Sequence, residues 1–114
     1  MSLPLSRLGM ATRALEVLEQ YRAHMAELKA DTSAMGIYLD VGSELDQLRA
    51  LSSIDARLSV PMVQLLIAHT EVLASLWETS KSGCARLQQR AWSSHSAACE
   101  FMHERCQELV GRLH

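Results

Sequence analysis

Residues 61–79 read PMVQLLIAHTEVLASLWET, and their apolar side chains recur every three or four positions. This spacing predicts an amphipathic helix, because residues three and four apart lie on the same helix face. Pro61 suits the first turn, where a backbone N–H would have no helical partner. His69 lies at the centre of the stripe, where an aliphatic residue would be expected. The stripe itself consists of Met62, Leu65, Leu66, Val72, Leu73 and Leu76.

The apolar pattern continues beyond residues 80–83, which read SKSG. Read as a loop, this segment separates two antiparallel helices, over 61–79 and 84–112. Read as helix, it joins them into one long rod. Two closely spaced serines and a glycine favour the loop. The last helix is then expected to bury Leu87, Ala91, Ala98, Met102, Leu109 and Leu113, with Phe101 to one side.

The core-facing side of this last helix carries few large apolar side chains, because small residues and an inward-leaning Arg105 occupy much of it. A helix with so weak a stripe can complete its burial against a second chain. The sequence therefore predicts a homo-oligomer, most simply a dimer.

Two further helices are predicted upstream. One covers residues 5–30, with an apolar face of Leu8, Ala11, Leu15, Leu18, Tyr21, Met25 and Leu28. The other covers 33–52 after the capping residues of 31–33, with Ile37 or Tyr38, Val41, Leu45, Leu48 and Leu51 on its stripe. Gly36 and Gly42 are expected to let a neighbouring helix approach closely. Residues 52–58 form either a short helix or the frayed end of the second helix.

Four amphipathic helices with short connections predict an all-α fold, an antiparallel up-down bundle in one domain over residues 1–114. The composition agrees, because 48% of residues are hydrophobic, 21% are charged, and Pro and Gly are scarce. These proportions exclude extended disorder and low complexity.

The charge pattern argues against several partners. The formal net charge is −2 and acids and bases are mixed along the chain, so no basic stripe is available for nucleic acid. No apolar run approaches the ~20 residues that span a bilayer, and the first residues do not resemble a signal peptide. We therefore expect a cytoplasmic protein that binds neither membrane nor nucleic acid. Its three cysteines are expected to be reduced: Cys99 and Cys106, seven apart in one helix, are separated by about 10 Å, too far for a disulfide.

A metal site is one hypothesis for the last helix. His95, Cys99, His103 and Cys106 project within an arc of about 80° on one flank. Thiolate and imidazole suit zinc, and copper(I) also accepts soft sulfur ligands such as Met102. One helix cannot surround a tetrahedral ion, so His69 or a second subunit would have to contribute. The alternative is that the cysteines are small buried hydrophobes, and the paired Cys-x-x-Cys spacing of structural zinc sites is absent.

His69 itself is more simply a satisfied core histidine, bonded to a backbone carbonyl or to a hydroxyl such as that of Ser94. A role in a metal site, a cofactor site or a pH-sensitive interface is the other interpretation. No phosphate loop, Gly-x-Ser-x-Gly elbow or His-Glu-x-x-His pair is present, so we expect no enzymatic activity and no cofactor.

The leading hypothesis is a non-enzymatic protein interaction module. It would self-associate, or hold a partner helix as a chaperone does, through apolar surface beside Trp77, Trp92 and Ile67. Alternatively, Trp92 caps the core of the bundle itself. The likeness to small bacterial secretion or flagellar chaperones is one of size and helical architecture only. The rival hypothesis is a metal-binding or metal-sensing bundle, with Zn or Cu.

Overall fold

The computed structural model describes residues 6–77 and 84–113. Its elements are α1 (Arg7–Ala30), α2 (Met35–Ser52), the short 3-10 helix η1 (Ala56–Leu58), α3 (Ser59–Trp77) and α4 (Cys84–Leu113). No strand occurs among these residues. The prediction of an all-α helical bundle is therefore confirmed.

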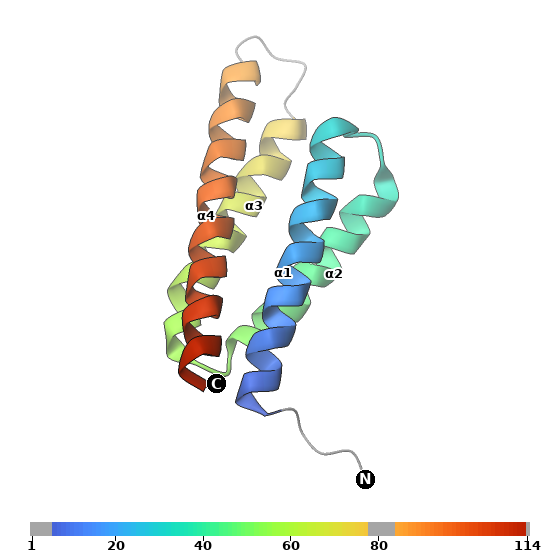
Figure 1. The fold of residues 1–114 in the computed structure, drawn as a ribbon. Coiled ribbons are helices and arrows are strands. Elements are labelled where there is room, and N and C mark those ends of the chain that lie inside the picture. Colours follow the sequence, from blue (N-terminus) through green and yellow to red (C-terminus); the bar gives the residue numbers. More distant parts are fainter. Residues whose placement is uncertain (1–5, 78–83, 114) are drawn as a thin grey trace.

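The four long helices pack as two antiparallel pairs, α1 with α2 and α3 with α4. Helix α1 also packs along α4, whereas the contact between α2 and α3 is slight. Figure 1 shows α1 and α4 side by side, with α2 and α3 behind them. Because α3 and α4 lie against each other, they are not parts of one continuous rod. The predicted loop at 80–83 and the predicted helix end at 79 lie outside the described residues.

Local hydrogen bonds explain where the helices begin. The hydroxyl of Ser6 accepts a hydrogen bond from the Gly9 N–H at 3.0 Å, so α1 begins at Arg7 rather than at residue 5. Helix α2 begins at Met35 rather than at 33, because the N–H and hydroxyl of Ser33 both donate to Asp31. Residues 31–33 therefore close a turn before the helix. This also holds the pKa of the Asp31 carboxyl below its usual value.

Asp55 organises the connection between α2 and α3. Its carboxylate accepts the Arg57 N–H at 2.8 Å and so caps η1, and it forms a 2.8 Å ion pair with Arg7 of α1. The short-helix interpretation of this segment is thus correct. Helix α3 then begins at Ser59, two residues before the predicted start, which still leaves Pro61 in the first turn.

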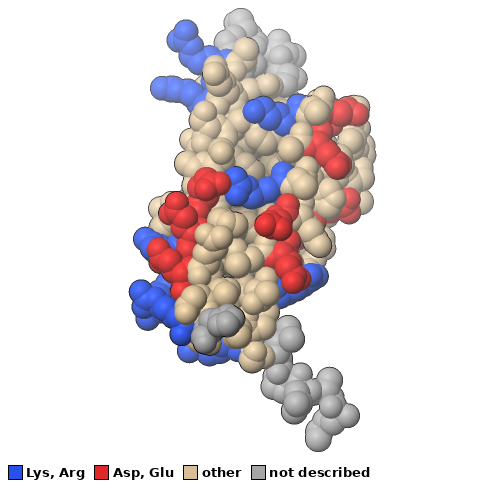
Figure 2. Space-filling model, viewed as in Figure 1, with Lys and Arg blue, Asp and Glu red and all other residues tan. Residues whose placement is uncertain are grey.

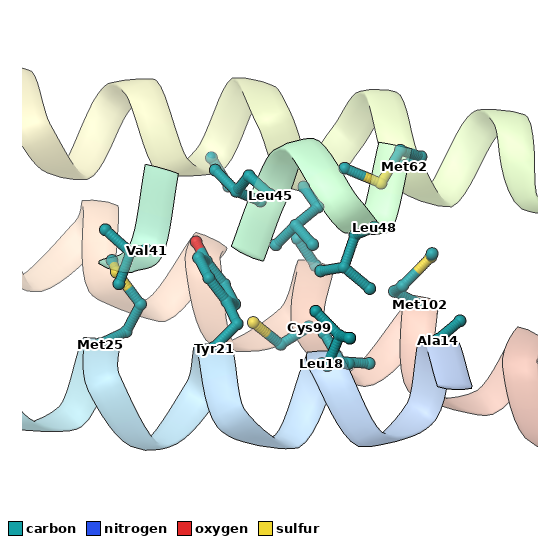
Figure 3. Packing of buried hydrophobic residues seen from close by; sticks show 14 of the residues in the cluster. Ala14, Leu18, Tyr21, Met25, Val41, Leu45, Leu48, Met62, Cys99 and Met102 are labelled. Carbon is teal, nitrogen blue, oxygen red and sulfur yellow. The ribbon is translucent and has the colours of Figure 1, made fainter. Parts of the chain in front are cut away.

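The core lies along the inner stripes of all four helices. Figure 3 shows Tyr21 projecting from α1 beside Leu18 and Met25, while Cys99 and Met102 enter from α4. The predicted stripes supply most of the buried residues, together with several side chains that the prediction omitted: Ala14, Val17, Leu58 and Ala68. Cys99 and Cys106 are also buried, as in the alternative in which the cysteines are small buried hydrophobes.

Two residues expected in the core of α4 are outside it. Leu87 is 52% exposed, because the residues that face it across the α3–α4 groove, Ala74 and Ser75, are too small to cover it. Arg105 is exposed, and its guanidinium carbon lies 5.1 Å from the centre of the Phe101 ring. Its long side chain thereby keeps its charge in water.

The glycine prediction was wrong. A Cβ added at Gly36 or Gly42 would meet no atom within 4 Å, so neither glycine makes room for a neighbouring helix. Their lack of a side chain leaves α2 with backbone freedom that no packing contact requires.

Candidate functional site

Three buried polar side chains meet at the centre of the bundle. The hydroxyl of Tyr21 lies 2.8 Å from Nδ1 of His69 and 2.7 Å from Nε2 of His95. Each residue comes from the apolar stripe of a different helix, α1, α3 and α4, so the three side chains converge where those stripes face one another. The partner of His69 is thus a tyrosine of another helix; Ser94 is exposed.

The protonation states of this cluster follow from its burial. Desolvation lowers the pKa of His69, and it lowers the pKa of His95 to about 4, with smaller effects from His69 and the guanidinium of Arg22. Burial also raises the pKa of the Tyr21 hydroxyl. Both imidazoles are therefore neutral at pH 7. The Tyr21 hydroxyl can then donate to one ring nitrogen while accepting an N–H from the other imidazole.

Such an arrangement ties helices together rather than activating a nucleophile. Burial raises the pKa of the Cys99 thiol to about 11, so this neighbour of His95 is protonated at pH 7. Its sulfur lies 3.9 Å from each ring nitrogen of His95. The cluster is a buried polar network whose groups have hydrogen-bond partners, and it joins α1, α3 and α4.

The predicted metal ligands do not gather into one site in the described part of the chain. His69 and His95 point at Tyr21, and the buried Cys106 has its pKa raised to about 11 by desolvation. Nδ1 of His103 is buried without a hydrogen-bond partner. Among residues 6–77 and 84–113, no group of three or more His, Cys, Asp or Glu side chains is placed to hold an ion.

A second polar pair, His24 and Glu44, was not predicted from the sequence. Glu44 is buried on the inner face of α2, and its carboxylate oxygens lie 2.9 and 2.8 Å from Nδ1 of His24 on α1. This hydrogen bond is the main cause of the raised pKa of His24. The signal was available, because Glu44 falls on the same stripe as Val41 and Leu48.

The three predicted partner-binding residues lie on two different surfaces. Ile67 and Trp77 are 55% and 77% exposed on α3. Trp92 is half-buried on α4 against the core, with its ring 5.7 Å from that of His95 in an edge-on arrangement. The Lys29 ammonium lies 5.5 Å from its centre. The geometry of Trp92 thus matches the alternative in which it caps the bundle's own core.

An exposed apolar stripe runs along α3 on the side away from the core. It consists of Val60, Val63, Ile67, Thr70, Ala74 and Trp77, all exposed, and is called here the outward α3 face. Sequence reasoning picked out Ile67 and Trp77 but missed Val60 and Val63. Their spacing was the available signal, since successive members are alternately three and four residues apart.

Helix α3 is thus apolar on both sides. The expectation that no apolar run approaches the length of a membrane span needs correction here: by length and composition alone, the segment Ala56–Trp77 could cross a membrane, and 39% of its most apolar stretch is buried in this fold. The face made by α1 and α4 differs, because Figure 2 shows basic and acidic side chains interspersed across it. One of these pairs joins Arg22 to Glu100 at 2.7 Å.

Comparison with known proteins returned no family model, no curated protein and no solved structure that matches this chain.

Proposed function

We propose that the chain is a non-enzymatic, cytoplasmic interaction module that contacts a protein partner through the outward α3 face. The observation that carries the proposal is the exposed stripe itself. A helix that is apolar all round is normally covered on every side, yet Val60, Val63 and Ile67 are each more than half exposed on the single chain. A contiguous apolar surface of this kind is typical of interaction sites.

The chemistry of α3 favours a protein over a lipid or nucleic-acid partner. Residues 59–77 contain one carboxylate, Glu71, and no Lys or Arg. Helices that lie on membranes usually present basic residues beside their apolar face, and nucleic-acid binding depends on basic side chains. An apolar helix of another protein requires neither.

The buried polar network supports this role by fixing the surface. Because Tyr21 bonds to both His69 and His95, it ties α3 to α1 and α4. A contact helix that is held in place before binding loses less conformational entropy when the partner docks. The network thus contributes to the interaction surface without touching the partner.

A photo-reactive side chain at position 67 tests the proposal in living cells. The matched control is position 39, since Leu39 is also apolar and is 79% exposed, but on α2. We expect position 67 to form a covalent adduct with protein and position 39 to form little or none. Adducts with lipid alone, no adduct, or equal labelling at both positions would contradict the proposal.

A further inference from the structure

The outward α3 face has the spacing of a coiled-coil seam. Its six positions, 60, 63, 67, 70, 74 and 77, correspond to alternating a and d positions of a heptad repeat. The seam runs for about 26 Å along the helix. At 100° per residue it lies opposite the buried side of α3, and two of its members, Ile67 and Ala74, also border the α3–α4 groove.

The seam is also symmetric about its own midpoint. The six positions lie in pairs at equal distances from the point between Ala68 and His69. We propose that a second copy of this chain occupies the outward α3 face, with the two α3 helices antiparallel around a two-fold axis at that point. This inference rests on the proposed function and names its partner.

Each layer of this pairing joins residues that fit in size. Reversing one helix sets Val60 of one copy against Trp77 of the other. It also sets Val63 against Ala74, and Ile67 against Thr70. A larger side chain meets a smaller one in every layer, as knobs-into-holes packing requires. The two-fold axis repeats each layer, as an isologous interface demands.

The residues that flank the seam favour an antiparallel pairing of the two α3 helices. Gln64 and Glu71 flank one edge and are exposed, whereas Leu66 and Leu73 flank the other and are half-buried. In the antiparallel pair, the Gln64 amide of one copy can donate to the Glu71 carboxylate of the other.

On the opposite edge, Leu66 meets Leu73. A parallel pair would instead place Leu66 beside Glu71, an apolar side chain against a charge, and position 64 beside Ser59. Only the antiparallel arrangement matches polar with polar and apolar with apolar.

Sedimentation equilibrium of the purified full chain over a range of concentrations tests the pairing. We expect a monomer–dimer equilibrium. Ile67→Asp, next to the axis, should raise the dimer dissociation constant by a factor of about a hundred or more, because it buries two like charges. Leu39→Asp, at an apolar position of α2 that is even more exposed than Ile67, should leave the dissociation constant unchanged.

Position 64 reports the direction of the helices. Gln64→Lys should tighten the dimer by about tenfold, because each introduced ammonium faces Glu71 of the other copy, and Gln64→Glu should weaken it by a similar factor. Because position 64 is exposed, both variants should keep the helical circular dichroism of the parent chain.

A chain that stays monomeric overturns the self-pairing, as does a dimer indifferent to Ile67→Asp. Equal effects of the two Gln64 variants overturn the antiparallel arrangement. If the purified chain is monomeric while position 67 still cross-links to protein in cells, the interaction module stands and its partner is a different chain.

Discussion

The hydroxyl of Tyr21 lies 2.8 Å from Nδ1 of His69 and thereby bonds α1 to α3 across a largely apolar core. Figure 3 shows the ring of Tyr21 reaching from α1 toward the opposite helices. Because the same hydroxyl also contacts His95, its loss affects three helices at once.

Tyr21→Phe should lower the free energy of unfolding by about 2 to 4 kcal/mol, because it leaves two buried imidazole nitrogens without partners. Urea unfolding followed by circular dichroism measures the change. Tyr38→Phe is the matched control, since the Tyr38 hydroxyl donates to the Thr32 carbonyl at the surface. It should cost no more than about 1 kcal/mol. Equal effects at the two positions would show that the central network contributes nothing beyond an ordinary hydrogen bond.

Stability should fall as the pH decreases from about 6.5 to about 4. An unfolded histidine has a pKa near 6.5, whereas the pKa of buried His95 is about 4 and that of His69 is also lowered. Between these pH values the unfolded chain takes up protons that the folded chain does not, so the free energy of unfolding decreases. For His95 alone the loss is ~3 kcal/mol at pH 4. Urea unfolding at steps of pH measures it.

The pKa of His24 is shifted in the opposite direction to those of His69 and His95, so His24 supplies the control. Its pKa is raised, first by the hydrogen bond to Glu44, so its stabilisation is complete below the unfolded pKa and is lost as pH rises through the folded pKa. His24→Gln should therefore lower the stability at and below pH 6.5 while leaving the slope of the fall toward pH 4 nearly unchanged. A His24→Gln chain whose stability is flat or rises over this range would contradict the neutral, buried state of His69 and His95.

Gly42→Ala should raise the free energy of unfolding by up to ~1 kcal/mol, because alanine favours the helix and its Cβ meets no neighbouring atom. Thermal unfolding measures the gain. Gly111→Ala, close to the end of α4, has the same open surroundings but should give a smaller gain, since helix ends fray. A destabilised Gly42→Ala chain would mean that another chain approaches α2 at this position.

The two tryptophans should behave differently. Trp92→Ala should lower the free energy of unfolding by about 2 to 3 kcal/mol, because Trp92 packs against His95 and the core beneath Lys29. Trp77→Ala should change the stability of the monomer by less than ~0.5 kcal/mol, since that side chain is 77% exposed. The free energies of unfolding of both variants, measured at low protein concentration, give the comparison. Similar losses would place Trp77 in the monomer core.

The periodic features of this chain could be predicted from its sequence. His69 falls at the centre of a helical stripe, so its burial followed from spacing alone. The hydrogen bonds from Tyr21 to His69 and to His95 could not be predicted, because they join residues that are 48 and 74 positions apart. Such contacts depend on how three helices rotate and slide against one another.

The predictions of burial failed at stripe positions whose burial depends on the residues of a neighbouring helix. Leu87 has the right spacing for the core, but the small residues across from it, Ala74 and Ser75, leave it uncovered. Glu44 has the wrong chemistry for the core but is buried, because His24 of α1 satisfies its carboxylate. The outward α3 face shows the same limit, since spacing alone does not tell which stripe of α3 the single chain leaves exposed.

Fluorescence of Trp77 tests the central claim, that a second copy covers the outward α3 face. In a Trp92→Phe chain, Trp77 is the remaining tryptophan. As the protein concentration rises through the dimer dissociation constant, its emission maximum should move to shorter wavelength in step with the mass from sedimentation. An emission maximum that stays at the wavelength of water-exposed tryptophan while the mass doubles would contradict the claim.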